Sequence, residues 1–409
     1  MPAAPPTPPG ELRILAWMCA IIAVNQLGFG AILPVLPLFA QSFGVSASAI
    51  GMTIAVYGLA RFLSAMPCGR LADQVGRRPT LALGGLITAL GNAWCAYASS
   101  FTEFMLARFV AGAGAGIVLT IGSVILADIS TPARRGRMMA VYQAVFLFAV
   151  GIGPLPGGLL AEHLGLAAPF ELYAIAAVVV TIIAWFGVPE TRGFGRDAAS
   201  SQPLTDVSFA RQVRLLTANT GFLLICLFGF THAVVRTGGL FNIVPVIGAT
   251  ELQLSASRIG AALAIGSVLG LFAAYPAGMM ADRFGRKPVI VPSCLFVGVA
   301  MAGFAYATSF TGFALACVAW GIATSISGAA PAAYAADSAP PGMNAAAMSS
   351  YRMLSDLGYV VGPIGLGLLV DYQGTDTTLI VSATMIVAVG LLFAHFAPET
   401  WRAAGGLSR

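Results

Sequence analysis

Charged residues are scarce in this chain, and their scarcity limits what it can be. Asp, Glu, Lys and Arg make up 9% of its 409 residues, and there are three histidines. A soluble globular protein carries about 25% charged residues. The sequence also lacks a P-loop, a Ser/His/Asp set and a metal-ligand cluster near a water-facing end. We therefore expect a protein that is not an enzyme, has no cofactor and does not use ATP.

Paired cysteines are also missing. The six cysteines lie singly in apolar stretches, and no C-x-x-C pair or Cys/His cluster occurs (Cys19, Cys68, Cys95, Cys226, Cys294 and Cys317). A free cysteine in such surroundings behaves as a small hydrophobic residue. The spacing therefore predicts packing residues, with no metal and no disulfide.

Long apolar runs are what the chain has instead. Apolar residues make up 58% of it, and its mean hydropathy is +0.87. A membrane-spanning helix needs about 20 apolar residues. Twelve runs meet that length, at 12–40, 48–70, 79–99, 103–128, 137–161, 169–188, 219–248, 257–279, 288–308, 312–336, 346–370 and 376–397. The sequence predicts an all-α integral membrane protein with twelve transmembrane helices.

The one long polar segment divides these runs into six and six. Residues 2–9 are polar and Pro-rich, and the first apolar run is too long for a signal peptide. The expected domains are a disordered tail (1–11), a six-helix bundle (12–189), a cytoplasmic linker (190–214), a second six-helix bundle (215–398) and a C-terminal tail (399–409).

Lys and Arg predict the orientation. With the N-terminus inside, 16 of the 21 cations fall on the inner side, while the outer loops hold only Arg258. Cytoplasmic loops are enriched in Lys and Arg. We expect a multi-pass protein of the plasma or inner membrane with both termini in the cytoplasm. The net charge of +5 is explained by these loops, so no nucleic-acid partner is expected.

The chain is internally duplicated. The charged turn Gly69–Pro79 recurs as Gly278–Pro288, which is 209 residues later (278 minus 69). The same offset aligns Ala127-Asp128 with Ala336-Asp337, Gly153-Pro154 with Gly362-Pro363, and Pro189-Glu190-Thr191 with Pro398-Glu399-Thr400. One register without gaps predicts two homologous six-helix halves in parallel orientation.

Three motifs carry a family resemblance. The turn at Gly69–Pro79 resembles the G-x-L-a-D-r-x-G-R-r/k signature of the major facilitator superfamily (MFS), Arg108–Gly116 resembles its helix 4 motif, and Gly153–Gly158 resembles the helix 5 G-P-x-x-G-G motif of drug:proton antiporters. Ala144 stands where the full helix 5 motif has glycine, and Asn25 stands where several relatives have Asp. The resemblance implies the MFS fold and secondary transport.

The resemblance also implies an inner gate. In the family, the acid of the signature pairs with a nearby Arg and faces the inner end of helix 11, which holds the halves together when the outside is open. The corresponding residues here are Gly69, Asp73, Gly76, Arg77 and Asp128, with Asp282 and Arg286 in the second copy. The alternative is that these charges only set the topology.

The helix 5 motif is expected where the halves touch and pivot. Its residues are Gly153, Pro154, Gly157 and Gly158. Small residues allow close helix packing, and proline bends a helix. Ordinary tight packing is the alternative.

Charged residues inside the spans are the candidates for proton coupling. Only Asp356 lies near mid-membrane among the acids, and Arg352 lies four residues before it on the same helical face. Such groups are costly in lipid and are functional candidates by default. We assign proton coupling to Asp356, Arg352 and Arg108, while a static ion pair that orients helix 11 is the alternative.

Polar and aromatic residues of the spans are candidates for the substrate cavity. They are Asn25, Gln26, Arg61, Tyr142, Gln143, His232, Arg236, Asn242 and Tyr351. A cationic cavity would suit an anionic substrate. The alternatives are packing roles for Arg61 and His232, and lipid-facing positions for the aromatic residues.

The leading functional hypothesis is a monomeric secondary transporter that exports small organic or amphipathic compounds in exchange for protons. The second is an uptake symporter for an organic anion. A membrane receptor is the alternative from another class. The partners expected for the transporter are the lipid bilayer, a small-molecule substrate and protons.

Overall fold

The computed structural model describes residues 10–130, 132–192, 215–327, 330–339 and 344–400. Within these ranges the chain is helical and has no strand, and eleven helices are long and apolar enough to cross a membrane. The run expected at 79–99 forms the twelfth, α4 (Arg77–Ala96), whose glycines, threonines and Asn92 make it less apolar than the others. The all-α membrane fold class is confirmed.

The chain divides into two compact units. Unit 1 contains Met1–Val35 and Val56–Gln202, and unit 2 contains Leu36–Ala55 and Pro203–Arg409. The division follows the expected bundles except at Leu36–Ala55, which groups with unit 2. The expected tails and linker fall largely on residues 1–9, 193–214 and 401–409, which lie outside the described residues.

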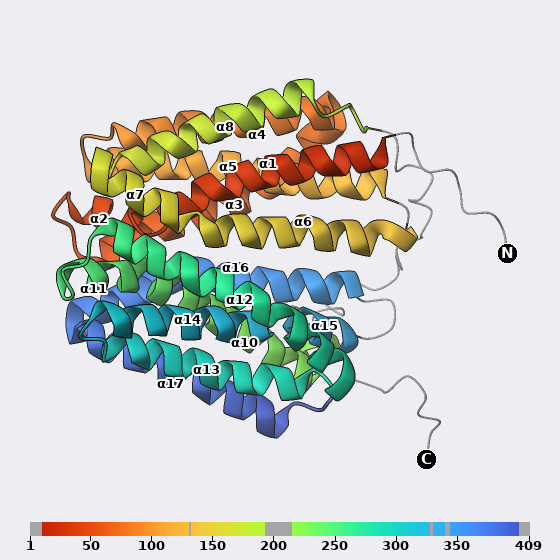
Figure 1. Ribbon diagram of the computed structural model, residues 1–409. Helices are drawn as coiled ribbons and strands as arrows, with labels where there is room; N and C mark the ends of the chain where they lie inside the picture. The colour runs from red at the N-terminus through yellow and green to blue at the C-terminus, as the bar shows by residue number, and fades with distance from the viewer. Residues whose placement is uncertain (1–9, 131, 193–214, 328–329, 340–343, 401–409) are drawn as a thin grey trace, which may run out of the picture. The chain divides into compact units, whose positions relative to one another are not determined.

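The helices of unit 1 follow the apolar runs (Figure 1). They are α1 (Glu11–Ile32), the second part of α3 (Ala47–Val75), α4, α5 (Phe101–Ile129), α6 (Pro132–Ile152), α7 (Pro154–Leu164) and α8 (Ala168–Phe186). Within the unit, α1 packs against α6 and α8, and α4 packs against α5 and α8. Its core is a cluster of Ile, Leu, Val, Met and Ala side chains that includes Met18, Ile21, Ile121 and Leu126.

Unit 2 contains α2 (Leu36–Gln41), the start of α3, α10 (Thr220–Val234), a π-helical segment (Val235–Ile243), α11 (Val244–Thr250), α12 (Ala256–Phe284), α13 (Lys287–Ala305), α14 (Phe310–Ser327), α15 (Ala330–Asp337), α16 (Asn344–Gln373) and α17 (Thr375–Phe396). Here α10 packs against α16 and α17, and α13 packs against α14 and α17. These pairs match the pairs of unit 1 one by one, as a duplicated chain predicts.

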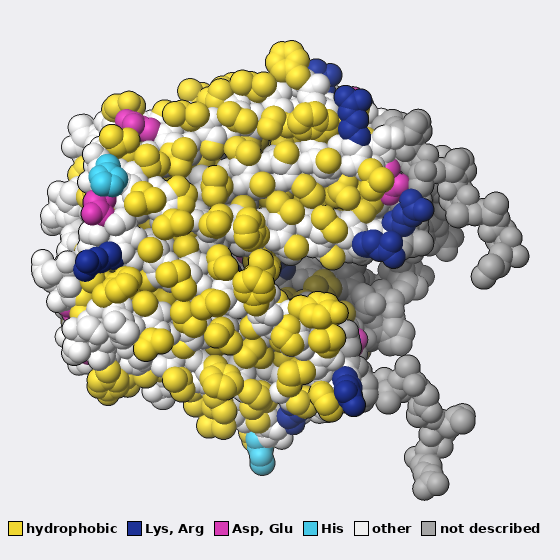
Figure 2. Space-filling view, viewed as in Figure 1, with side chains coloured by type: hydrophobic (Ala, Val, Ile, Leu, Met, Phe, Trp, Pro, Cys, Tyr) yellow, Lys and Arg dark blue, Asp and Glu magenta, His cyan; other side chains and the backbone are white. Residues whose placement is uncertain are grey.

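Side-chain chemistry matches a lipid environment. On the face that Figure 2 shows, hydrophobic side chains cover the middle of the helices, and Lys and Arg side chains lie near the helix ends. Several large apolar side chains are more than half exposed, among them Phe272, Phe186 and Ile175. A soluble monomer rarely exposes so continuous an apolar surface, whereas in a bilayer this surface contacts lipid.

Candidate functional site

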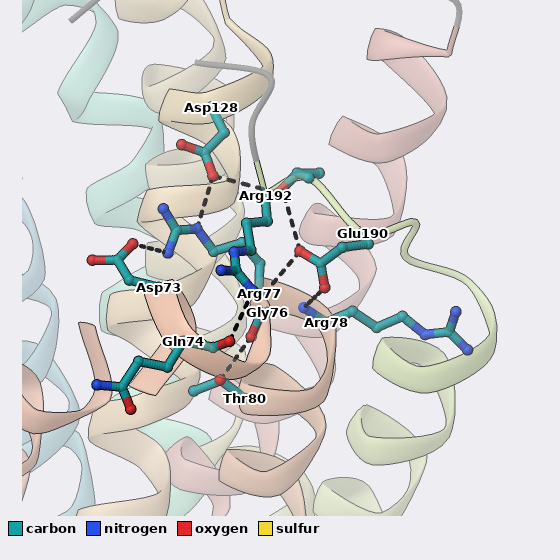
Figure 3. A network of polar contacts seen from close by, with 10 residues as sticks. Asp73, Gln74, Gly76, Arg77, Arg78, Thr80, Asp128, Glu190 and Arg192 are labelled. Atoms are coloured by element: carbon teal, nitrogen blue, oxygen red, sulfur yellow. Dashed lines mark hydrogen bonds and ion pairs between the residues drawn. The ribbon is translucent and has the colours of Figure 1, made fainter. Parts of the chain in front are cut away.

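The charged turn of unit 1 forms one polar network, which we name the Arg77 network (Figure 3). Arg77 Nε donates to Asp128 Oδ2 at 3.0 Å, and Arg77 Nη1 pairs with Asp73. Asp128 also accepts from Thr191 Oγ1 at 3.4 Å. Burial lowers the pKa of the Arg77 guanidinium, but the bonds to Asp73 and Asp128 outweigh it and raise that pKa overall. The expected trio of Asp73, Arg77 and Asp128 is therefore in contact.

The two acids of this network differ in exposure. The Arg77 side chain is 13% exposed and that of Asp128 is 16% exposed, whereas the Asp73 side chain is 69% exposed. An exposed ion pair contributes about 0–1 kcal/mol. Asp128 therefore holds Arg77 more firmly than Asp73 does, although Asp73 lies in the signature turn.

Glu190 is the member of the network that the sequence reasoning missed. Its carboxylate accepts from the backbone N–H of Arg77 at 2.9 Å and of Arg78 at 3.2 Å, and also from the N–H of Arg192. The first N–H groups of a helix have no partner within the helix, so Glu190 caps α4. Burial raises the pKa of Glu190, but these backbone donors outweigh it, and the pKa lies below its ordinary value of 4.5.

Gly76 is required by this cap. Its φ of 121° and ψ of 159° lie in a region that only glycine adopts readily. A Cβ at Gly76 would also collide with the Glu190 carboxylate. Gly69 differs, because a Cβ there would meet nothing within 4 Å.

Unit 2 repeats the arrangement around Arg286. Arg286 Nε lies 3.5 Å from Asp337 Oδ2, and Thr400 Oγ1 donates to the same carboxylate at 3.5 Å. Glu399 accepts from the backbone N–H of Arg286 at 3.1 Å and of Lys287 at 2.9 Å, which caps α13. All these residues follow their unit 1 counterparts by 209 positions. Asp282 lies on α12, and its side chain is outside the described residues.

The second copy is more open than the first. The Asp337 side chain is 37% exposed, and a hollow beside it is lined by Asn219, Ser338, Pro398 and other residues of unit 2. Arg286 Nη1 donates to the carbonyl of Ala281 at 2.9 Å. The repeated turn thus preserves the helix cap.

The helix 5 motif packs closely on α1. The span breaks between α6 and α7 at Gly153-Pro154, where proline occupies the first position of the new helix. A Cβ at Gly153 would lie 2.6 Å from Gly30 Cα, and one at Gly157 would collide with the Ala31 carbonyl. Gly158 is buried. This packing within unit 1 explains why these positions carry glycine.

A buried polar cluster lies deeper in unit 1. Arg108 is 1% exposed, and its guanidinium lies 4.3 Å from the centre of the Tyr57 ring. Asn25 donates to Gln26 at 2.9 Å and accepts from Tyr173 at 3.4 Å. The predicted residues Asn25, Gln26 and Arg108 are therefore buried polar groups of one unit, and Tyr173 is an addition to the prediction.

Two other predicted cavity residues of unit 1 lie elsewhere. Tyr142 is 5% exposed and belongs to the apolar core cluster, where its hydroxyl has no partner among the described residues. Gln143 is exposed. Arg61 is half-buried on α3.

In unit 2 the predicted residues gather on α10 and the π-helical segment. The His232 ring stacks between Phe228 and Trp320, with centroids 5.7 and 6.1 Å away. Arg236 lies over Phe241 at 5.2 Å. Asn242 is 2% exposed and donates to the Pro363 carbonyl at 3.4 Å. Helix segments with the wider π geometry are frequent at functional sites.

The predicted ion pair on α16 is not observed. Arg352 is exposed, and no hydrogen bond or ion pair joins it to any residue that the structure describes. Asp356 and Tyr351 are half-buried. Spacing of four residues brings two side chains to the same face of a helix, but it does not fix their rotamers.

Comparison with known proteins agrees with this geometry. The family model of the Major Facilitator Superfamily matches residues 18–237 and again residues 233–406. The chain belongs to the Major Facilitator Superfamily. It is a membrane transporter and not an enzyme.

Relatives within the superfamily include resistance proteins. The chain is 24% identical over 383 residues to multidrug resistance protein 2 of Bacillus subtilis, covering 90% of this chain and 92% of that one. It is 28% identical over 295 residues to the class C tetracycline resistance protein of Escherichia coli, covering 70% and 72%. A solved structure of the human organic anion transporter MFSD10 superposes with a TM-score of 0.66 at 20% identity, covering 95% and 100%. The last likeness concerns the fold alone.

Proposed function

We propose that this MFS transporter exports small organic or amphipathic compounds in exchange for protons by alternating access. The observation that carries the proposal is the glycine contact of α6 and α7 with α1. Gly153 and Gly157 belong to the motif that resembles the antiporters, and each allows a backbone approach that a Cβ would prevent. The resistance proteins among the relatives support the same direction of transport.

In this proposal Asp356 is the proton-coupling residue. It is half-buried on α16, and it was the only acid expected near mid-membrane. Arg352, four residues before it, is exposed and forms no ion pair with the residues that the structure describes. A carboxyl group that changes its surroundings between two states can bind a proton in one and release it in the other.

The test is proton-driven flux in proteoliposomes with an imposed pH gradient, against a panel of amphipathic cations, tetracyclines and organic acids. Asp356→Asn removes the proton site and keeps the shape. We expect it to lower transport driven by the pH gradient at least about ten-fold and to leave substrate counterflow measurable. Asp376→Asn, at an exposed acid in the first turn of α17, is the matched control. Wild-type pH-driven flux in Asp356→Asn would place the coupling site elsewhere.

An organic-anion substrate is the second proposal. It rests on Arg108, a cation that is 1% exposed within unit 1 and that could pair with a carboxylate or phosphate. The likeness to the organic anion transporter MFSD10 is compatible with it, although that likeness concerns the fold. Arg108→Gln separates the two proposals: it should abolish flux of organic acids and spare flux of amphipathic cations.

The proposed setting is the plasma or inner membrane, with a monomeric chain and both termini in the cytoplasm. The Arg77 and Arg286 networks then lie on the inner side, because α1 starts inside and each span reverses direction. Labelling of single cysteines near residues 10 and 400 with an impermeant reagent tests this orientation.

A further inference from the structure

Arg78, the second residue of α4, has a guanidinium that takes no part in the Arg77 network. Its backbone N–H is bound by Glu190, but its side chain extends away from that carboxylate (Figure 3). The residue is half-buried, and its Nε is shielded from solvent with no hydrogen-bond partner among the residues that the structure describes. Within the same described ranges, no acid forms an ion pair with this guanidinium.

The guanidinium of Arg78 lies over an aromatic ring instead. Its Cζ is 5.0 Å from the centre of the ring of Trp185, which lies in the last turn of α8. A cation over an aromatic face is attracted by the ring, and this contact does not use the N–H donors as a hydrogen bond does. The ring therefore holds the cation in place without supplying an acceptor for its donors.

Close packing of α4 on α8 keeps these two side chains together. A Cβ at Gly85 would lie 2.5 Å from Thr181 Oγ1, so these positions of the two helices face each other. Arg78 precedes Gly85 by two helical turns, and Trp185 follows Thr181 by one turn. Both contacts lie within unit 1, so the arrangement does not depend on unit 2.

The Arg78–Trp185 pair lies where an exposed apolar side of α8 ends. Ile175, Ile182 and Trp185 are 63%, 51% and 47% exposed, and intervals of seven and three residues place them on one side of the helix. In a bilayer this side contacts acyl chains, and tryptophan is enriched at the boundary between membrane and water. The guanidinium therefore lies at the level of the lipid head groups.

Unit 2 does not repeat this pair. At the offset of 209, Lys287 corresponds to Arg78 and Ala394 corresponds to Trp185. Lys287 Nζ donates to the Ala397 carbonyl at 2.8 Å, so this cation is bound by its own unit, and alanine offers no ring. Both copies nevertheless have the same glutamate cap. The cap therefore does not require the Arg–Trp pair, which points to a role confined to unit 1.

We propose that Arg78 and Trp185 bind one anionic phospholipid of the leaflet at this end of unit 1. The planar guanidinium pairs with the lipid phosphate, the Trp185 ring packs on the glycerol region, and an acyl chain follows the exposed side of α8. Arg70 and Arg192 are also exposed at this end, so a lipid of net negative charge is favoured over a zwitterionic one. The inference depends neither on the transported substrate nor on the direction of transport.

The test is native mass spectrometry of the full-length protein, which resolves states with individual bound lipids. Delipidated protein in detergent is titrated with phosphatidylglycerol and, separately, with phosphatidylcholine, which carries the same phosphate without a net charge. The parent should bind the first phosphatidylglycerol about five-fold more tightly than the first phosphatidylcholine. In Arg78→Gln, loss of a charge-assisted hydrogen bond should weaken the first phosphatidylglycerol about ten-fold and remove the preference. The helix cap uses only the backbone of Arg78, so this variant should fold.

Variants at matched positions separate the pair from net charge. Lys287→Gln removes the corresponding cation of unit 2 and should leave the affinity for the first phosphatidylglycerol unchanged. Trp185→Leu keeps an apolar side chain but loses the ring, and it should weaken binding about three-fold, the size of an exposed cation–π contact. Because Arg78 and Trp185 touch, the double variant should lose less affinity than the product of the two single losses.

A soluble anion is the other source of a phosphate. Inorganic phosphate has no acyl chain, so at equal concentration it should not displace the first phosphatidylglycerol; displacement would assign the site to a soluble anion and overturn the lipid assignment. The proposal also fails if Arg78→Gln binds phosphatidylglycerol as tightly as the parent. Equal losses in Lys287→Gln and Arg78→Gln would overturn it as well, since the lipid would then follow net charge and not this pair.

Discussion

Glu190 offers the sharpest test of the Arg77 network. The substitution Glu190→Gln keeps the size of the side chain and one acceptor oxygen, but removes the negative charge and the second acceptor. Two of the donors that Glu190 binds are the first N–H groups of α4, those of Arg77 and Arg78. The variant therefore weakens the cap of one helix and leaves the ion pairs of Arg77 with Asp73 and Asp128 in place.

The expected magnitude follows from the cap. Loss of a helix cap costs about 0.5–2 kcal/mol, and a charge near a helix N-terminus contributes about 0.3–1 kcal/mol. Glu190 is exposed, so solvent screens its charge and the lower part of these ranges applies. We expect a loss of about 1 kcal/mol in the local opening free energy, which is a factor of about five in the opening equilibrium.

Amide hydrogen exchange of the purified protein in nanodiscs measures this opening. Exchange in the first turn of α4 should accelerate about five-fold in Glu190→Gln, while the first turn of α13 should not change. Glu399→Gln should give the reverse pattern, because Glu399 binds Arg286 and Lys287 in the same manner. Exchange within two-fold of the parent at both turns in both variants would refute the capping role.

The cap also predicts a pH dependence. The pKa of Glu190 lies below its ordinary value of 4.5, since the backbone donors favour the charged form. A group with a lowered pKa in the folded state stabilises fully above its unfolded value, and the contribution is lost as the pH falls through the folded pKa. Exchange in the first turn of α4, corrected for its intrinsic rate, should be constant from about pH 6 to pH 8 and accelerate only below 4.5.

Two further predictions concern the same network. Gly76→Ala should destabilise unit 1 by about 1–3 kcal/mol, since alanine resists the φ of 121° and its Cβ meets Glu190; a melting temperature unchanged from the parent would contradict it. Asp128→Asn should destabilise unit 1 more than Asp73→Asn, because the Asp73 side chain is 69% exposed. Asp73→Asn should insert into the membrane normally and lose more transport than Asp282→Asn. Flux measurements on the three variants can check the transport comparison.

The fold could be predicted from the sequence because the features that determine it are local to each apolar run and are repeated in both halves of the chain. Each apolar run is long enough to cross a bilayer, and in lipid such a run must be helical to satisfy its backbone. The offset of 209 then predicted that the helix pairs of unit 1 recur in unit 2, and they do. The grouping of Leu36–Ala55 with unit 2 was not foreseen, because it depends on contacts with α16 that no run length encodes.

The site was less predictable because spacing does not determine which partners meet. Asp73 and Arg77 are four residues apart and form an ion pair, whereas Arg352 and Asp356 have the same spacing and do not. The difference lies in a distant group: Asp128 fixes the Arg77 guanidinium at 3.0 Å. Arg352 is exposed, and no such group contacts it among the residues that the structure describes. Spacing along a helix thus identifies possible pairs, and the surrounding helices select among them.

A signal for Glu190 was nevertheless present in the repeat. Pro-Glu-Thr follows the sixth and twelfth spans at the same offset that relates the two charged turns. Two segments that are duplicated in one register but lie 113 positions apart are expected to meet in both halves if they meet in one. The Arg77 and Arg286 networks fulfil this expectation.

The duplication also separates structural requirements from features that are free to change. The glycine with positive φ, the capping glutamate and the Arg–Asp–Thr contact occur in both units. Any six-helix half of this kind needs them to start its third helix. Arg286 also donates to the Ala281 carbonyl and lies beside a hollow. Because these shared features satisfy the helix end in each unit, we expect substitutions of them to affect the folding of either half.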